Sequence, residues 1–422
     1  MLPSPEERKR MRAEKAAERA KKQRKSLVIR LIIAAVVVLL CGVLIFVLSR
    51  KKPQKDTAET KPTNTQTAET TTPEPTQPAT TVIHYAAVGD LNINDATVAS
   101  GGTGYDYTAT FMDIAYLLAD ADVTSVNFEG NLVGEPYGST YSAPQSMITA
   151  LQKAGVDLVQ MANSYSINRG ISGLSSSLDA VRAAGMEPLG AYPTNEAFKE
   201  SKGYTIRNVR GIKMAFVAFT KGMDGMALPP GSEDCVNVLY TDYDSGYQDV
   251  NEEKITSVLT AVKKEKPDII VALLHWGSEY NNTVSESQES IVSLLQANGV
   301  SAIIGTHSHY VQGMTFDAQQ GTFVAYSLGD FFSDAQRAGS EYSVVLDLEI
   351  TKDNRTGKTQ VTGFTYTPIF TVHEADQPLR VVRIREAVEA YKSGYYLKVS
   401  SETYEKMTYA LSRIDARIAG EQ

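Results

Sequence analysis

The sequence predicts an α/β protein with mixed sheets, and three observations support this. Apolar segments of strand length alternate with amphipathic segments of about 10–15 residues along most of residues 82–330. Two later strand-like segments are joined by a polar turn, which is typical of an antiparallel hairpin. Only two cysteines occur in 422 residues, so a hydrophobic core rather than disulfides must stabilise the fold.

The first 48 residues predict a cytoplasmic tail and a membrane anchor. Residues 1–26 alternate charges with alanine, and basic residues dominate them. Residues 31–48 carry no charge and would span about 27 Å as a helix, so we place a transmembrane helix at 27–48. The basic residues in front of it favour a cytoplasmic N-terminus. A cleaved signal peptide is the alternative, although its apolar core is usually only about 7–15 residues long.

Residues 49–81 predict a disordered linker, because they are rich in Thr, Pro, Glu, Gln and Lys and cannot bury a core. The main domain is expected at 82–375, followed by a helical extension at 376–422. With a cytoplasmic N-terminus and a single span, the main domain would face outward from the cell membrane.

The elements of the main domain follow from length and periodicity. Strands are expected at 82–90, 123–131, 156–164, 213–220, 267–277, 300–309 and 321–330. Helices are expected at 108–121, 143–155, 171–185, 251–266 and 285–299, and three of these end on glycine. The hairpin strands are 341–350 and 360–370, and an amphipathic helix at 400–419 closes the chain.

The part after the linker is acidic. Residues 82–422 carry 25 Lys and Arg against 41 Asp and Glu, a net charge of −16. Because proteins that bind nucleic acids neutralise phosphates with basic surfaces, nucleic acid is excluded as a partner. Cys235 is the only cysteine in this part, so an internal disulfide and a cysteine-rich zinc site are also excluded.

Ionisable and polar side chains collect at the predicted strand ends, where α/β sheets bind their ligands. They are Asp90, Glu129, Asn131, Asn163, Ser164, His275, Glu279, His307, His309 and Asp330. Imidazoles and carboxylates bind divalent metals such as zinc or manganese, which acidify water for hydrolysis. Since residues i and i+2 of an extended segment project to one side, His307 and His309 would reach one metal, or one each of two adjacent metals.

Each residue also has a simpler interpretation when it is taken alone. A lone aspartate such as Asp90 usually caps the next helix, and His275 beside a tryptophan could be a core residue. His84 and His373 have no partners in the sequence and are predicted to be structural. The combination, rather than any single residue, predicts a metal site.

The same residues lie in segments that resemble the CapA-type family of poly-γ-glutamate capsule synthesis proteins, which is related to calcineurin-like metallophosphatases. The matching segments are VGD (88–90), NFEGNL (127–132), MANSYSINRG (161–170), LLHWGSEY (273–280), IIGTHSHYVQ (303–312) and AYSLGDF (325–331). The resemblance implies a metallophosphatase-like α/β/β/α sandwich that is anchored in the membrane and faces outward. It implies metal-site positions at Asp90, Glu129, His275, His307 and His309.

The chain departs from the family pattern in the third of these segments. The family usually has Asn-Asn-His-x-x-Asp where this chain has Asn163, Ser164, Tyr165 and Asn168. Serine is a poor metal ligand, and tyrosine is a weaker proton donor than histidine at neutral pH. Tyr165 is assigned to the catalytic position. Substrate binding is assigned to Asn131, Asn163, Arg169 and Glu279.

Three functions are compatible with these features. The first is the synthesis or export of poly-γ-glutamate or a related capsule polymer, with a partly degenerate metal site, an anionic polymer as substrate and polymer synthase subunits as partners. The second is a metallophosphatase-like hydrolase that uses a divalent metal to cleave a phosphoester or a polymer amide bond. The third is a non-catalytic scaffold of a membrane synthase complex. The sequence leaves open whether the protein is an enzyme.

Overall fold

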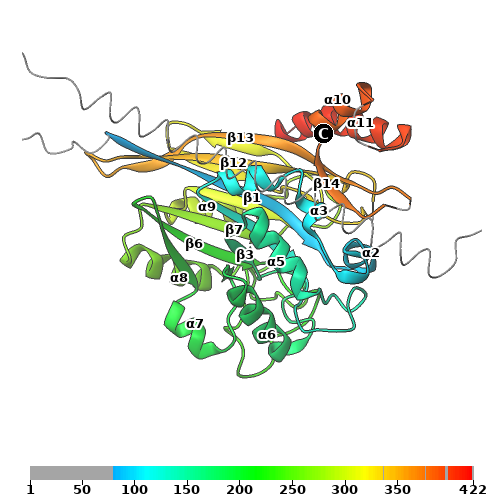
Figure 1. The fold of residues 1–422 in the computed structure, drawn as a ribbon. Helices are drawn as coiled ribbons and strands as arrows, with labels where there is room; N and C mark the ends of the chain where they lie inside the picture. The colour runs from blue at the N-terminus through cyan, green and yellow to red at the C-terminus, as the bar shows by residue number, and fades with distance from the viewer. Residues whose placement is uncertain (1–78, 336, 376, 395–397, 421–422) are drawn as a thin grey trace, which may run out of the picture. The chain divides into compact units, whose positions relative to one another are not determined.

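Two mixed sheets pack face to face in the part of the chain that the computed structural model describes, which is residues 79–420 except 336, 376 and 395–397 (Figure 1). The eight-stranded sheet contains β1 (Thr80–Asn92), β2 (Val123–Glu129), β3 (Leu158–Gln160), β4 (Glu187–Leu189), β11 (Asp330–Phe332), β12 (Tyr342–Asp353), β13 (Thr359–Val372) and β14 (Arg380–Arg383). Its order is β14-β13-β12-β1-β2-β3-β4, with β11 paired to β1. Strands β1 to β4 are parallel, and β12 to β14 add an antiparallel part.

The six-stranded sheet has a parallel centre and antiparallel edges. It contains β5 (Tyr204–Val209), β6 (Ile212–Thr220), β7 (Ile269–His275), β8 (Ala302–Thr306), β9 (Met314–Asp317) and β10 (Thr322–Ala325). The order is β5-β6-β7-β8-β10-β9, and the two edge strands, β5 and β9, run antiparallel to their neighbours. The prediction of an α/β fold with mixed sheets is therefore confirmed.

Helices cover the outer face of each sheet. The helices are α2 (Asp95–Ala99), α3 (Thr108–Phe111), α4 (Ala115–Asp120), α5 (Gln145–Ala154), α6 (Gly170–Ala183), α7 (Asn195–Ser201), α8 (Glu252–Lys264), α9 (Glu286–Ala297), α10 (Ile384–Lys392) and α11 (Ser401–Ile418). Buried side chains of α3 to α6 share a core with the outer face of the eight-stranded sheet, and those of α8 and α9 share one with the six-stranded sheet. The layers are therefore helices, sheet, sheet and helices.

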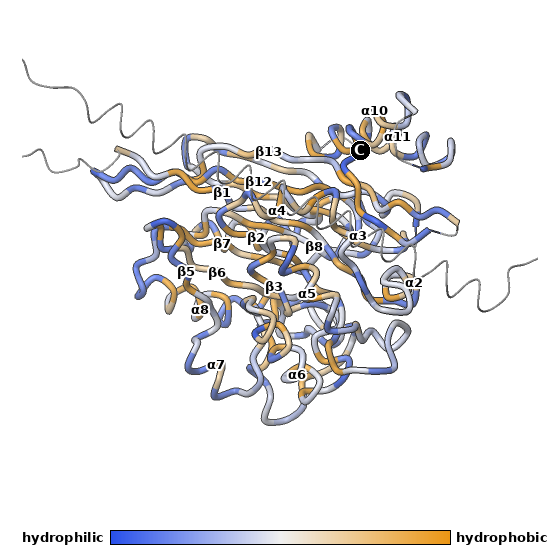
Figure 2. Tube along the Cα trace, viewed as in Figure 1, coloured by the Kyte–Doolittle hydropathy of each residue, from blue (hydrophilic) through white to orange (hydrophobic). Residues whose placement is uncertain are grey.

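Strand alternation explains how one strand serves two cores. On β6, Met214 and Phe216 enter the core between the sheets, whereas Ala215 and Val217 face helices α8 and α9. The Phe216 ring lies 5.8 Å from the ring of Tyr85 on β1, which joins the two sheets. Figure 2 shows the hydrophobic residues concentrated on these central strands. The sequence of such a strand is a continuous apolar run, because the other sheet covers one face of the strand and helices cover the other.

The predicted hairpin and most of the predicted helices are confirmed, but one helix differs. The segment 108–121 forms two short helices, α3 and α4, rather than one. The carbonyl of Asp113 in the break accepts a hydrogen bond of 3.0 Å from Arg383 Nε. This long-range contact is invisible to local periodicity.

The C-terminal segment contributes to the same core as the sheets. Strand β14 extends the eight-stranded sheet at its edge, and Met407, Ala410 and Ile414 of α11 join the core between the sheets. The predicted membrane anchor at 27–48 and most of the predicted linker lie outside the described residues. Within the described part, no helix is long and apolar enough to cross a bilayer.

Candidate metal centre

The carboxyl ends of parallel strands from both sheets meet at one place. Register puts Asp90 of β1 beside Asn127 of β2 and beside Asp330 of β11. In the other sheet His275, the last residue of β7, pairs with Thr306, the last residue of β8. The sheets therefore bring together side chains that are more than 200 positions apart in the chain.

Two groups of three potential ligands share Asp90. One group is Asp90, Glu129 and His275, and the other is Asp90, His309 and Asp330. Within each group one ligand atom of every residue lies within 4.8 Å of the others, and all five side chains are buried. Carboxylate oxygens and imidazole nitrogens form a donor set that suits zinc or manganese, and the shared carboxylate allows two adjacent cations.

Asn127, which the sequence reasoning missed, orients the first group. Its Nδ2 donates to Asp90 Oδ1 at 2.6 Å and to Glu129 Oε1 at 3.1 Å, and lies 3.2 Å from His275 Nδ1. Its Oδ1 accepts a hydrogen bond of 3.1 Å from Asn163, so the two amides form one network. The amide of Asn127 thus contacts all three residues of the first group. Its position two residues before Glu129, on the same face of a strand, was the available signal.

His307 and His309 follow β8 in left-handed backbone conformations, with φ of 90° and 59°. The expectation that they extend a strand is therefore wrong, because β8 ends at Thr306. The His307 ring lies 4.4 Å from that of His275, whereas His309 Nδ1 lies 2.7 Å from Asp330 Oδ1. This turn costs roughly 1–3 kcal/mol per strained residue, a type of strain that clusters at functional sites.

The turn also holds Asp90 and leaves one buried atom without a partner. The backbone N–H of His307 donates to Asp90 Oδ2 at 2.9 Å. The buried Nδ1 of His307 has no hydrogen-bond partner among the described residues. An unsatisfied buried nitrogen beside two ligand groups is the observation that fits this cluster to a cation.

Three buried carboxylates lie close together at this site. Burial raises the pKa of Asp90 to about 6, and Asp330 raises it further while His309 opposes the shift. Burial, and next the charge of Asp90, raise the pKa of Glu129. A divalent cation would offset this accumulation of negative charge.

The three imidazoles differ in charge. Burial lowers the pKa of both His275 and His307, so both are neutral, as metal ligands must be. For His309, burial alone would lower the pKa, but Asp330 and the other carboxylates outweigh it and raise the pKa to about 10. His309 is therefore an imidazolium that pairs with Asp330 when no metal is bound.

Two cavities flank the cluster. One, of about 240 Å³, is lined by His309, Asp330 and Tyr165 among others. The other, of about 280 Å³, is lined by His307 and Ser164 among others. Glu279 lines both cavities.

Some of the other predicted site residues lie near the cluster, and Arg169 does not line the cavities beside it. Tyr165 stacks on Tyr141 with ring centroids 4.4 Å apart, and burial raises the pKa of its hydroxyl, so the phenol keeps its proton. Ser164 Oγ lies 3.1 Å from His275 Nε2. Asn131 is buried after β2, whereas Arg169 is exposed at the start of α6 and lines neither cavity.

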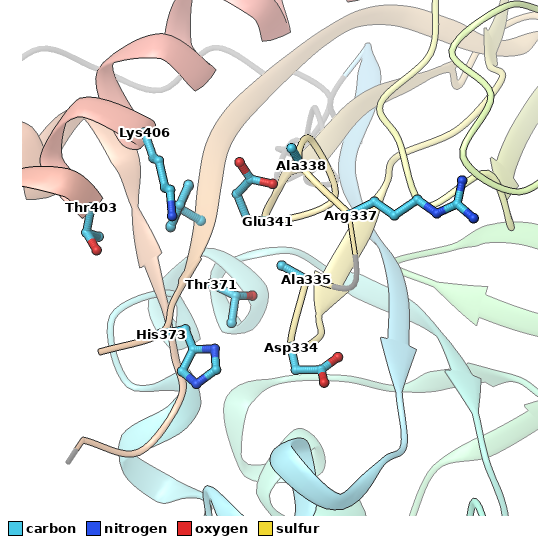
Figure 3. Close-up of a pocket in the computed structure, with 10 residues that line it drawn as sticks. Asp334, Ala335, Arg337, Ala338, Glu341, Thr371, His373, Thr403 and Lys406 are labelled. Atoms are coloured by element: carbon cyan, nitrogen blue, oxygen red, sulfur yellow. The ribbon is translucent and has the colours of Figure 1, made fainter. Parts of the chain in front are cut away.

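The two histidines predicted to be structural lie away from the cluster. His84 is exposed on β1, with Nδ1 3.0 Å from Asp347 Oδ1. His373 lines a third cavity of about 270 Å³ together with Glu341 and Lys406 (Figure 3). In Figure 3 Arg337 is directed away from His373, and its guanidinium lies 4.3 Å from the centroid of the Tyr280 ring.

Comparisons with known proteins identify relatives in capsule synthesis. Residues 84–335 match the model of the family described as "Bacterial capsule synthesis protein PGA_cap". The chain is 26% identical over 264 residues to "Capsule biosynthesis protein CapA" of Bacillus anthracis, covering 60% of each chain. It is 26% identical over 233 residues to "PGA biosynthesis protein CapA" of Bacillus subtilis, covering 54% of each. The match thus spans less than two thirds of the length of these relatives.

Solved structures show weaker likeness. A novel phosphatase from Mycoplasma pneumoniae aligns with a TM-score of 0.42 and 12% identity, over 69% of this chain and 94% of that chain. A hypothetical protein from Thermus thermophilus aligns with a TM-score of 0.39 and 15% identity, over 68% and 98%. Both scores are below 0.5.

Proposed function

Because the chain belongs to the bacterial capsule synthesis protein PGA_cap family, we propose that it acts in the synthesis or export of poly-γ-glutamate or a related capsule polymer. The observation that carries this proposal is the pair of buried ligand groups that share Asp90. All five ligand residues lie within the segment that matches the family model. The protein would be membrane-anchored and outward-facing, with polymer synthase subunits as partners and an anionic polymer as substrate.

The cluster fits a divalent cation, zinc or manganese. Asp90, Glu129 and His275 would hold one cation, and Asp90, His309 and Asp330 the other. When bound, such a cation acidifies water and polarises carbonyl or phosphoryl oxygens. Asn127 and Asn163 orient the carboxylates through their amide network, and the turn at His307 fixes Asp90 by its backbone N–H.

Polymer output tests this function. In cells of the source organism, the double substitution His307→Ala/His309→Ala is expected to reduce capsule polymer to near the level of a deletion strain, because it removes imidazoles from both sides of Asp90. The protein level is measured by immunoblotting, and His84→Ala serves as the control. Unchanged polymer output at an unchanged protein level would favour the non-catalytic scaffold instead.

A second candidate function is metal-dependent hydrolysis of a phosphoester or of an amide bond of the polymer. Tyr165 favours it, because its protonated phenol lines the same cavity as the ligands His309 and Asp330. A donor that stays protonated suits stabilisation of a developing oxyanion better than proton transfer.

Tyr165→Phe tests the hydrolase. It is expected to lower turnover of a model phosphoester or of a γ-glutamyl oligomer by about 10²-fold, the effect of removing one donor to an oxyanion. Metal content, measured by elemental analysis, should not change, because Tyr165 is not among the ligands. Equal turnover in Tyr165→Phe and the wild type would exclude this role, and loss of metal would make the role structural.

A further inference from the structure

One lysine lies beside the cluster, and among the described residues no carboxylate is within ion-pair distance of it. Lys221 follows the last residue of β6 and lines the cavity of about 280 Å³ together with His307 and Ser164. Its backbone N–H donates to the carbonyl of His275 at 2.7 Å, which ties its position to a ligand residue. Neither the strand-end motifs nor the comparisons assign it a role.

The ammonium group of Lys221 is held by a carbonyl and an aromatic ring, and Glu279 acts on it only from beyond ion-pair distance. Its Nζ donates to the carbonyl of Gly277 at 2.8 Å and lies 4.5 Å from the centroid of the Tyr247 ring. Across the part of the chain that is described, no carboxylate lies within 4.0 Å of this nitrogen. An ammonium group has three donors, so donors remain for a ligand in the cavity.

A glycine brings Tyr247 close to Lys221. A Cβ on Gly222 would lie 2.2 Å from the carbonyl oxygen of Tyr243 and 2.7 Å from the Tyr247 ring. No side chain fits at this position, so the loop after β6 packs directly on the aromatic residue. The lysine is therefore held by backbone and aromatic contacts.

A second observation points to a ligand in the same cavity. His307 lines it, is only 4% exposed, and has an Nδ1 with no hydrogen-bond partner among the described residues. A buried nitrogen of this kind is normally satisfied by a neighbour, a water or a ligand. The cavity thus places the Lys221 ammonium beside a histidine whose buried Nδ1 is unsatisfied.

Acidic residues at the rim of the cavity limit the negative charge that a bound polar group can carry. Asp224 and Glu279 are exposed at the cavity, where they would repel a phosphate dianion more than a carboxylate. A single carboxylate would pair with the Lys221 ammonium and would place only one negative charge near the rim. Carboxylates spaced along a polymer meet this condition one at a time.

We propose that the Lys221 cavity is a carboxylate subsite that binds one carboxylate of the polymer and places the adjacent linkage at the metal centre. This inference rests on the proposed function, because it takes the substrate to be a polymer of γ-linked glutamate. Lys221 is then a residue that determines specificity, and it is not a metal ligand.

Binding by the full-length, metal-loaded protein in detergent tests the subsite. The probe is a γ-linked glutamate oligomer, measured by calorimetry beside an oligomer of equal length whose carboxylates are carboxamides. Lys221→Met is expected to weaken binding of the acidic oligomer about 10–100-fold, as expected when a charge-assisted hydrogen bond is lost. Lys221→Arg should retain most of the affinity. Lys199→Met, on the exposed surface of α7, is the matched control and should not change it.

The outcomes separate the subsite from the function on which it rests. Equal affinity of the wild type and Lys221→Met for the acidic oligomer would overturn the subsite and leave the polymer as substrate. Binding of the carboxamide oligomer as tightly as the acid would also overturn it. If the wild type binds neither oligomer, the polymer substrate fails, and the subsite with it. If inorganic phosphate at equal concentration displaces the acidic oligomer, the proposal of a carboxylate ligand is overturned, and phosphate is the ligand of this cavity.

Discussion

Substituting asparagine for Asp90 is expected to abolish metal binding in both ligand groups at once. Asp90 is the one residue that the two groups share, so its loss leaves each with two ligands. Substitutions that only reorient metal ligands typically cost about 10–100-fold in affinity, and removing a shared ligand should cost more. Elemental analysis of the purified protein, before and after reloading with zinc or manganese, measures the effect.

Single-group variants sharpen this prediction. Glu129→Gln and Asp330→Asn each alter one group, so each should leave metal in the other. Asp330→Asn is expected to cost more, because the Asn127 amide contacts all three residues of the group of Glu129 but only the shared Asp90 of the other group. Asp120→Asn, on the exposed end of α4, is the control. Full metal content in Asp90→Asn would show that the cluster is not the metal site.

His309→Ala is expected to destabilise the metal-free protein by about 3–5 kcal/mol at pH 7. The imidazolium of His309 pairs with Asp330 at 2.7 Å, and both side chains are buried. Removing one partner leaves uncompensated buried charge, which has this typical cost. Chemical unfolding in the presence of a chelator measures the free energy of unfolding.

A matched surface pair provides the control for this prediction. His84 and Asp347 form the same type of pair at 3.0 Å, but their side chains are 47% and 40% exposed. His84→Ala should therefore cost only roughly 0–1 kcal/mol, as exposed pairs do. Equal costs for the two substitutions would mean that the buried pair contributes no special stability.

The pH dependence adds a second test of the same pair. The pKa of His309 is raised to about 10 in the folded protein, above the value of about 6.5 expected for an unfolded chain. Its stabilising contribution is therefore complete below about pH 6.5 and is lost as the pH rises toward 10. The difference between the wild type and His309→Ala should shrink between pH 7 and pH 9.5. A constant difference would contradict the assigned charge.

Local sequence patterns were sufficient to predict most of the helices and strands. Strand β7 and helix α9 were predicted within two residues of their bounds, because buried strands and amphipathic helices have distinct periods. The short edge strands β5, β9 and β14 were missed, since they are held by their neighbours in the sheet more than by their own composition. At the break between α3 and α4, the carbonyl of Asp113 is hydrogen-bonded to Arg383, which is remote in sequence.

Some residues of the candidate site were predicted from the sequence, and others were found only in the structure. Asp90, Glu129, His275 and His309 were found because each follows or ends a predicted strand and is chemically suited to metals. Asn127 and Lys221 were missed, because an amide inside a strand and a lysine after one have no distinctive local pattern. Their roles come from contacts across the two sheets, such as Asn127 to His275 and Lys221 to Gly277.

By itself, the amino-acid sequence determined the α/β class, the family segments and the set of ligand types at strand ends. Those properties depend on residue chemistry and on periods of two and 3.6 residues, which are local. Only the tertiary structure decided that Asp90 is shared by two groups, that His307 and His309 face different sides, and that Lys221 borders the cluster. These facts depend on strand pairing between distant segments and on a left-handed turn after β8, and the sequence encodes both only through the packing of the whole domain.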